Sequence, residues 1–235
     1  MISGRTRLVG LIGNPVAGSL SPRMQNAAFA ARGLDWAYLP LEVEPDRVGE
    51  AVRGLVALGF EGANVTAPYK TDVVAFCDEA EAESVNLLVV RERRVYGSST
   101  DAEALSGIEA TRAAVLGAGG ASMAWIAALE VAGIEVRVFA RRGDWPPRVE
   151  DCDLVVNTTP VKDLALFEPG PRQAVIDLPY NTDGSPTRLV QAARAAGCRA
   201  VVDGLEVLAS QGAASFERWT GVPAPLEVML AAIRP

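Results

Sequence analysis

A short run of small residues, GAGGAS at positions 117–122, separates an apolar segment from an alanine-rich one. The apolar segment AAVL before it has the composition of a buried strand, and residues 121–133 after it favour a helix. A strand, a glycine turn and a helix open a dinucleotide-binding unit, where small residues let the backbone approach a pyrophosphate at the helix N-terminus. The run therefore predicts an α/β fold and a nucleotide site in the second half of the chain, although Ser122 replaces the third glycine or alanine of the motif.

Strand-like and helix-like segments alternate along the rest of the chain, which is typical of α/β proteins. Before residue 101 we expect strands at 7–13, 36–43 and 59–67, helices at 22–33 and 46–59, and a hairpin at 84–97. After it we expect helices at 104–110, 121–133, 187–197 and 205–221, with strands at 112–116, 135–140, 153–160, 173–180 and 198–204. The pattern restarts near residues 101–112, so the sequence predicts one α/β unit on each side of that point.

The composition excludes several classes of function. The net charge of −7 and the pI of about 4.8 argue against nucleic acid as a partner, because binding to phosphates requires a concentrated basic surface. We expect no membrane segment and no signal peptide, since no apolar run is long enough. Three widely spaced cysteines indicate a reduced, cytoplasmic protein without a disulfide framework or zinc site.

The chain contains no histidine. This excludes Ser-His-Asp and Cys-His mechanisms and most zinc chemistry. An acid–base step must therefore use Lys, Tyr, Asp, Glu or Cys side chains.

Arg141 and Arg142 follow the second strand of the nucleotide unit, where an NAD enzyme usually has an acidic residue for the ribose. A carboxylate would repel a 2′-phosphate, whereas guanidinium groups bind it by paired hydrogen bonds. The pair favours NADP over NAD, unless both arginines are merely solvated surface residues.

The connection after that strand is unusually short. Only RRGDWPPRVEDC, residues 141–152, lies before the next expected strand, and Pro146 and Pro147 prevent a regular helix there. A complete dinucleotide-binding half has a helix, a third strand and a return connection in this interval. We therefore predict a shortened Rossmann-like domain in which residues 135–140 form an edge strand, with a weaker hold on the adenine side of the cofactor.

Two polar residues stand in distinctive strings: Lys70 ends NVTAPYK and Asp101 ends GSSTD. Alone, either could be an ordinary surface or capping residue. Together with five other segments in the same order, they make the chain resemble the shikimate dehydrogenase family. The other segments are GNP with SLSPRMQN at 13–26, SVN at 84–86, NTTPV at 157–161, DLPY at 177–180, and GLEVLASQGAASFERWTG at 204–221.

The resemblance implies a two-domain α/β protein and a role for each matching residue. The domains would be a substrate-binding catalytic domain at 1–101, the shortened NADP-binding domain at 102–203 and a helical segment at 204–235 that returns to the first. Lys70 and Asp101 would be catalytic, transferring a proton as the nicotinamide transfers hydride. The substrate-binding residues would be Ser19, Ser21, Thr66, Asn86, Tyr180 and Gln211. The cofactor-binding residues would be Gly117, Gly119, Gly120, Ala121, Arg141, Arg142, Thr158, Thr159, Pro160 and Gly204.

The function implied is NADP-dependent reduction of 3-dehydroshikimate to shikimate, with a small molecule as partner and a homodimer left open. Several residues depart from the family pattern, namely Gly18, Gln25, Leu87, Ser99, Ala102, Ala140, Lys162 and Val207. Two alternatives therefore remain: a quinate/shikimate-type dehydrogenase acting on a related ring polyol, and a non-catalytic ligand-binding homologue with a decayed cofactor site. A folate-type methylene dehydrogenase ranks lower, because that function does not require SLSP or NVTxPxK.

Overall fold

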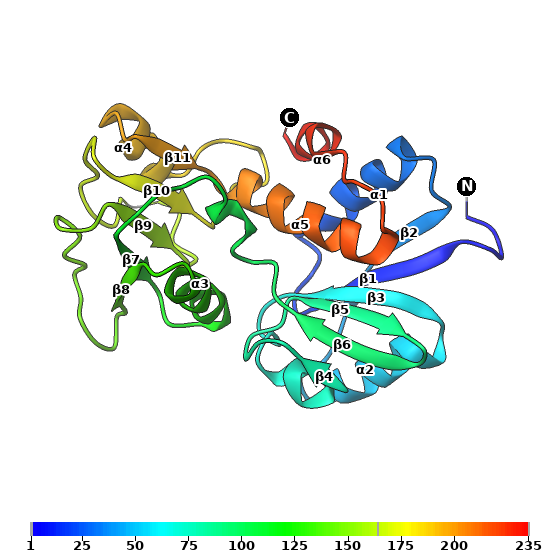
Figure 1. Ribbon diagram of the computed structural model, residues 1–235. Helices are drawn as coiled ribbons and strands as arrows, with labels where there is room; N and C mark the ends of the chain where they lie inside the picture. Colours follow the sequence, from blue (N-terminus) through cyan, green and yellow to red (C-terminus); the bar gives the residue numbers. More distant parts are fainter. Residues whose placement is uncertain (1, 164, 235) are drawn as a thin grey trace. The chain divides into compact units, whose positions relative to one another are not determined.

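The computed structural model describes residues 2–163 and 165–234, which form two compact units (Figure 1). Unit 1 comprises residues 1–100 and 209–235, and unit 2 comprises residues 101–208. Each unit has its own sheet and its own hydrophobic core. Within the described residues, no helix has both the length and the apolar character needed to cross a membrane.

Unit 1 is built on a mixed six-stranded sheet in the order β2-β1-β3-β5-β6-β4. Strand β1 pairs in parallel with β2 and β3, while β5 pairs antiparallel with β3 and β6. The strand bounds are β1 Arg7–Gly13, β2 Trp36–Glu42, β3 Phe60–Val65, β4 Glu79–Ala80, β5 Leu87–Arg91 and β6 Arg94–Ser98. The expected hairpin at 84–97 is therefore confirmed as β5 and β6.

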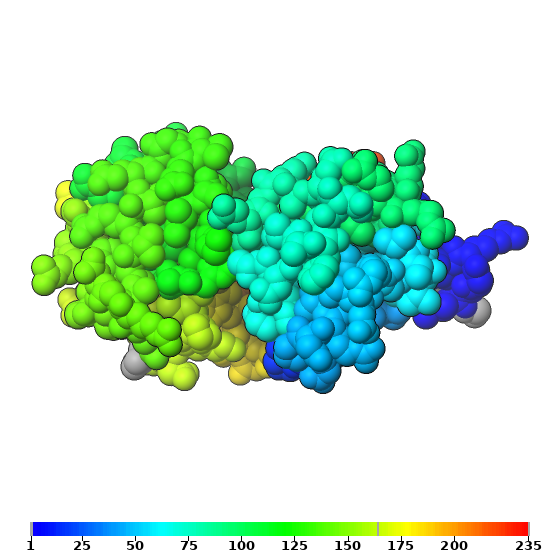
Figure 2. All heavy atoms as spheres, turned by 90° about the horizontal axis from the view of Figure 1, so that it is seen from below, coloured from blue at the N-terminus to red at the C-terminus, as the bar shows by residue number. Residues whose placement is uncertain are grey.

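Helices cover both faces of this sheet. Helix α2 (Val48–Ala57) packs Val52 and Leu55 against one face, and its outer residues form the sky-blue surface in Figure 2. Helices α1 (Ser21–Ala31), α6 (Leu226–Ile233) and the end of α5 (Gly204–Thr220) lie on the other face. There the ring of Phe29 stacks on that of Phe216 with centroids 5.3 Å apart. Two short 3₁₀ turns contact α2: Pro45–Arg47 directly precedes it in the chain, and Asp72–Phe76 lies between β3 and β4.

Unit 2 has a parallel five-stranded sheet in the order β11-β10-β9-β7-β8. Its elements are β7 Arg112–Leu116, α3 Gly120–Val131, β8 Glu135–Phe139, β9 Leu154–Asn157, β10 Ala174–Asp177, α4 Arg188–Ala195 and β11 Ala200–Val202. Central strands β7, β9 and β10 are buried on both faces, which explains their continuous apolar sequences. The helix expected at 104–110 is wrong: only a 3₁₀ turn forms, at Glu103–Leu105, before Gly107 adopts a φ of +80°.

The predicted shortening of this unit is confirmed. Residues 141–152 contain neither helix nor strand, and β8 is an edge strand. The order equals that of a six-stranded dinucleotide-binding sheet without the strand beyond β8. In place of a helix, the end of this connection places Val149 and Cys152 over Ala114 and Leu116 on one face of the sheet.

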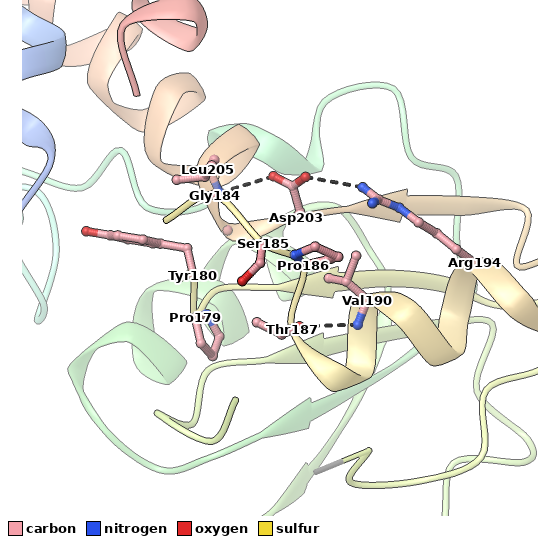
Figure 3. Close-up of a pocket in the computed structure, with 11 residues that line it drawn as sticks. Pro179, Tyr180, Gly184, Ser185, Pro186, Thr187, Val190, Arg194, Asp203 and Leu205 are labelled. Atoms are coloured by element: carbon pink, nitrogen blue, oxygen red, sulfur yellow. Dashed lines mark hydrogen bonds and ion pairs between the residues drawn. The ribbon is translucent and has the colours of Figure 1, made fainter. Parts of the chain in front are cut away.

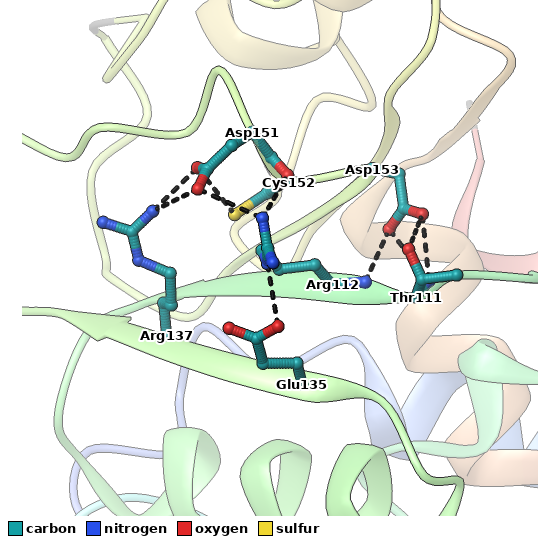
Figure 4. Close-up of polar contacts among 7 residues, drawn as sticks. All are labelled: Thr111, Arg112, Glu135, Arg137, Asp151, Cys152 and Asp153. Atoms are coloured by element: carbon teal, nitrogen blue, oxygen red, sulfur yellow. Dashed lines mark hydrogen bonds and ion pairs between the residues drawn. The ribbon is translucent and has the colours of Figure 1, made fainter.

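Charged residues attach this connection to the amino-terminal end of the sheet (Figure 4). Arg112 and Arg137 both contact the carboxylate of Asp151, at 3.3 and 2.7 Å. The carboxylate of Asp153 accepts hydrogen bonds from Thr111 N, Thr111 Oγ1 and Arg112 N. The connection is therefore held at its end by specific contacts even though it has no regular structure.

Candidate active site

Ser19 and Ser21, two of the predicted substrate-binding residues, lie at the start of α1. Ser21 is the first residue of the helix and is buried, and its backbone N–H donates to Ser19 Oγ at 3.2 Å. No side chain caps the helix at Leu20. The first turn of a helix carries backbone N–H groups that attract anions. Ser19 and Ser21 therefore lie beside backbone N–H groups that attract anions.

Two predicted substrate-binding residues meet inside unit 1. Asn86 Nδ2 donates to Gln211 Oε1 at 3.3 Å, although the residues are 125 positions apart in the sequence. Asn86 Oδ1 accepts from the backbone N–H of Thr100 at 2.8 Å. Thr100 Oγ1 in turn donates to the carbonyl of Gln211 at 3.1 Å. Thr100 thus fixes both amide residues, and it directly precedes Asp101 in the chain.

A second buried network supports the first and was not predicted as part of the site. Asn64 Nδ2 donates to the carbonyl of Asn86 at 3.0 Å and to Ser215 Oγ at 2.9 Å. Asn64 Oδ1 accepts from Tyr38 Oη at 2.9 Å. Burial raises the pKa of Tyr38 far above its usual value, so its hydroxyl remains a donor. Asn64 belongs to the NVTAPYK string and Ser215 to the string at 204–221, but neither of them nor Tyr38 was predicted to have a role in the site.

Lys70 lies in the turn that follows β3. Its carbonyl accepts from the backbone N–H of Val85 at 2.7 Å, and the neighbouring Tyr69 ring is buried with its hydroxyl 2.6 Å from the carbonyl of Val43. Thr66 begins the same turn, with its N–H bonded to Ile12 at 2.8 Å. The backbone on both sides of the half-buried Lys70 is therefore fixed. Asp101, the other predicted catalytic residue, is the first residue of unit 2 and is 8% exposed.

The glycine-rich turn of unit 2 joins β7 to α3. Gly117 has a φ of +121°, and a Cβ there would lie 2.3 Å from Thr158 Oγ1, so only glycine fits. Ser122 Oγ accepts from Gly119 N at 3.1 Å and contacts Thr158 Oγ1 at 2.6 Å. The serine that departs from the glycine motif thus bonds the turn to the segment after β9.

The other predicted cofactor residues follow the carboxyl ends of neighbouring strands. Leu116, Phe139 and Asn157 end β7, β8 and β9 and are paired in register. Gly119, Arg141 and Thr158 therefore come from three adjacent strand ends, which is where ligands bind in parallel α/β sheets. Gly119 is exposed with open space beside its Cα, and Gly120 and Ala121 begin α3. Thr159 and Pro160 continue the β9 exit, and Arg142 is exposed after β8. This set fits a dinucleotide phosphate carrying an additional negative group.

Tyr180 and Gly204 line one small hollow of about 40 Å³ (Figure 3). Gly204 begins α5, and a Cβ at that position would lie 2.4 Å from the carbonyl oxygen of Pro179. Asp203 caps the helix by accepting from Leu205 N and Glu206 N, and it pairs with Arg194 at 3.2 Å. The hollow is far smaller than a typical ligand pocket of about 300 Å³ or more, so Gly204 is required first for packing.

Comparison with known proteins decides the family. The profile described as "Shikimate dehydrogenase substrate binding domain" matches residues 11–89, and that of the "Shikimate 5'-dehydrogenase C-terminal domain" matches residues 204–234. The shikimate dehydrogenase (NADP(+)) of Anaeromyxobacter dehalogenans is 40% identical over 96% of this chain and 95% of its own length. This chain belongs to the shikimate dehydrogenase family.

Solved structures of the shikimate dehydrogenase family share the complete fold. The shikimate dehydrogenase of Aquifex aeolicus superimposes with a TM-score of 0.89, at 31% identity and with all of both chains covered. The Thermus thermophilus shikimate 5-dehydrogenase in complex with NADP(H) and shikimate gives a TM-score of 0.86, at 31% identity over 97% of this chain and 98% of that chain. The alignment with the Anaeromyxobacter relative extends over 270 residues, more than the 235 of this chain, so the relative contains segments that this chain lacks.

Proposed function

We propose that this protein catalyses the NADP-dependent reduction of 3-dehydroshikimate to shikimate. The observation that carries the proposal is the retention of the NVTAPYK turn with a rigid backbone at Lys70, in a chain 40% identical to an NADP(+) shikimate dehydrogenase. The Thermus thermophilus relative was solved with both NADP(H) and shikimate. The partner of this chain is accordingly a small molecule, and we assign the protein to a reduced compartment such as the cytoplasm.

Residues 1–101 and the returning segment 204–235 supply the substrate side of the proposal. Ser19 and Ser21 donate to the substrate carboxylate at the start of α1. Thr66, Asn86 and Gln211 surround the ring hydroxyls together with Lys70 and Asp101, and Tyr180 is a further substrate-binding residue outside these ranges. The Asn86–Thr100–Gln211 network supports this assignment, because amide side chains fixed in advance lose little conformational freedom when they bind a ligand.

Lys70 and Asp101 carry out the proton transfer. Lys70 Nζ donates a proton to the carbonyl oxygen during reduction and accepts it from the hydroxyl in the reverse direction. Asp101 orients the ammonium group and shares control of its protonation, so the pair acts as one unit. NADPH, when bound, supplies the hydride that reaches the carbonyl carbon.

Residues 102–203 hold the cofactor. Gly117, Gly119, Gly120 and Ala121 receive the pyrophosphate at the start of α3, and Arg141 and Arg142 bind the 2′-phosphate. Thr158, Thr159 and Pro160 border the remaining length of the dinucleotide, together with Gly204, which directly follows this range. The fit rests on the open space at Gly119 and on the bond between Ser122 and Thr158, which joins two of these segments.

The decisive experiment follows NADPH absorbance with 3-dehydroshikimate, in parallel with NADH and in reverse with shikimate and quinate. We expect turnover with NADPH and shikimate. Faster turnover of quinate would replace the substrate assignment by the quinate/shikimate type. NADPH binding without turnover of either ring acid would favour a ligand-binding homologue. Sedimentation of the same preparation distinguishes a monomer from a homodimer.

A further inference from the structure

Asp177 is a fully buried carboxylate that has no role in the proposed chemistry. It ends β10, where its register partner is Asn157 at the end of β9. Asp177 Oδ1 accepts from Asn157 Nδ2 at 2.7 Å, and Oδ2 accepts from Thr187 Oγ1. Buried carboxylates are retained only with such partners, so the position of this one requires an explanation.

The carboxylate determines which way the Asn157 amide faces. An ionised carboxylate accepts hydrogen bonds and donates none, so the NH₂ group of Asn157 must point towards it. The opposite end of the amide, Oδ1, then faces residue 159. It accepts from Thr159 N at 3.0 Å and from Thr159 Oγ1 at 2.7 Å. Asp177 thereby fixes the backbone and side chain of a residue that it does not touch.

Thr187 fixes the other side of the carboxylate. It is the N-cap of α4, and its hydroxyl oxygen accepts from Val190 N at 3.2 Å (Figure 3). Its hydroxyl proton is therefore directed to Asp177. The carboxylate is a shared acceptor between the first turn of α4 and the segment that leaves β9.

The segment leaving β9 is held independently at the preceding residue. Thr158 Oγ1 donates to the carbonyl of Leu116 at 2.7 Å and contacts Ser122 in the glycine turn. Two consecutive residues are thus attached to different parts of unit 2, Thr158 to the β7–α3 turn and Thr159 to β10 through Asn157. Such double attachment fixes a backbone path more narrowly than either contact alone.

We infer that Asp177 is a positioning residue for cofactor binding, acting through Asn157 to hold residues 158–160 in the shape that receives NADPH. The inference rests on the proposed function only in that it takes NADPH as the ligand. Asp177 contacts neither substrate nor cofactor in this scheme, so it should influence cofactor affinity without changing the chemical step.

The test compares Asp177→Asn with two matched variants. An amide at 177 has only one acceptor oxygen, and its other end is an NH₂ group that cannot accept a hydrogen bond. Either Asn157 or Thr187 therefore loses its acceptor. Thr187→Val removes one donor, and Thr187→Ser retains it. Asp153→Asn is the control, because Asp153 also accepts several hydrogen bonds in unit 2 but lies at the amino end of the sheet.

We expect Asp177→Asn to raise the NADPH dissociation constant and KM by about tenfold or more, the lower limit for losing a hydrogen bond to a charged group. Thr187→Val should raise the NADPH dissociation constant and KM as well, whereas Thr187→Ser should leave both at their wild-type values. In all three variants, kcat and the KM for shikimate should stay at wild-type values. Asp153→Asn should leave NADPH binding unchanged. Binding is measured by NADPH fluorescence and turnover by absorbance, so the two readouts are separate.

Four outcomes overturn the inference. Wild-type NADPH affinity in Asp177→Asn contradicts it while leaving the proposed function intact, as does an equal loss of affinity in Asp153→Asn. A fall in kcat at unchanged NADPH affinity would indicate a role in the chemical step instead. A wild-type protein that binds no NADPH refutes the proposed function, and this inference with it.

Discussion

Replacing Asp177 by Asn should also remove a component of the pH-dependent stability whose sign is opposite to that of most carboxylates. Burial raises the pKa of Asp177 to about 6, although hydrogen bonds from Thr187 and Asn157 oppose the shift. In the unfolded chain the pKa returns to its ordinary value of 3.8. The folded state therefore binds the proton more tightly than the unfolded state does.

Proton linkage gives the direction and the size of the effect. Because the folded-state pKa is raised, the contribution of Asp177 to stability is fully present below about pH 4 and is lost as the pH rises through about 6. A shift of about two pKa units corresponds to roughly 3 kcal/mol of unfolding free energy. The wild type should lose about this much relative to Asp177→Asn between pH 4 and pH 7.

Urea unfolding of both proteins at closely spaced pH values, followed by circular dichroism, measures this difference. Asp153→Asn provides a control of opposite sign. Burial disfavours ionisation of Asp153, but hydrogen bonds from Arg112 and Thr111 outweigh it and hold the pKa of that carboxyl below its usual value. Asp153 therefore stabilises the fold at neutral pH and loses this contribution as the pH falls. A wild-type minus Asp177→Asn difference that stays constant from pH 4 to pH 7 would refute the reasoning.

Four further outcomes are expected. Lys70→Ala should lower kcat by roughly 10²–10⁴-fold in the absorbance assay, with unchanged NADPH affinity. Lys70→Arg should not restore turnover, because a guanidinium stays protonated. A wild-type kcat in either variant would show that Lys70 has no part in the mechanism. Arg141→Asp should weaken NADPH binding by about 1–3 kcal/mol and NADH binding much less, as titration of both cofactors would show, whereas equal losses would make Arg141 a bystander. Gly117→Ala should destabilise unit 2 by about 1–3 kcal/mol in thermal unfolding, because its Cβ would meet Thr158 Oγ1 and its φ is +121°; an unchanged melting temperature would show that the turn relaxes. NADPH should bind to this protein more weakly than to the longer Anaeromyxobacter relative in side-by-side titrations, since the strand and helix beyond β8, which would border the adenine, are absent. Equal affinity would contradict this.

Sequence periodicity correctly predicted the helices and strands that are long enough to show a clear local pattern of apolar residues. Helix α2 and strand β7 lie where the spacing of apolar residues places them. The exceptions are short. Helix α6, eight residues packed on α1, was missed, because so short a helix depends on tertiary contacts. The false helix at 104–110 had helix-favouring residues but contains Gly107, which leaves the right-handed region.

Site residues that belong to a recognisable motif could be predicted from the sequence. Site residues that only the folding of the chain brings together could not. The string NVTAPYK identified Lys70 and Thr66 from the sequence through its resemblance to a family motif, but it assigned no role to Asn64. Tyr38 lies in no such string, and Ser215 stands in the 204–221 string without a role assigned to it. Ser215 reaches Asn64 because α5 packs in the first unit, whereas Tyr38 reaches it because β2 and β3 both pair with β1. Their bonds to Asn64 join residues 151 and 26 positions apart, a separation at which pattern reasoning has no information.

The short connection at residues 141–152 is a further example, because its sequence excluded a helix but did not indicate which contacts replace one. Pro146 and Pro147 were sufficient to predict that no helix follows β8. They could not predict how the exposed face of the sheet would be covered. Val149 and Cys152 now pack there, and Asp151 binds two arginines that project from β7 and β8. Exposed ion pairs of this kind each contribute little to stability, so their effect is geometric. They fix the end of the connection, while β8 fixes its start, and Arg141 and Arg142 are thereby kept near the carboxyl end of the sheet without the missing strand.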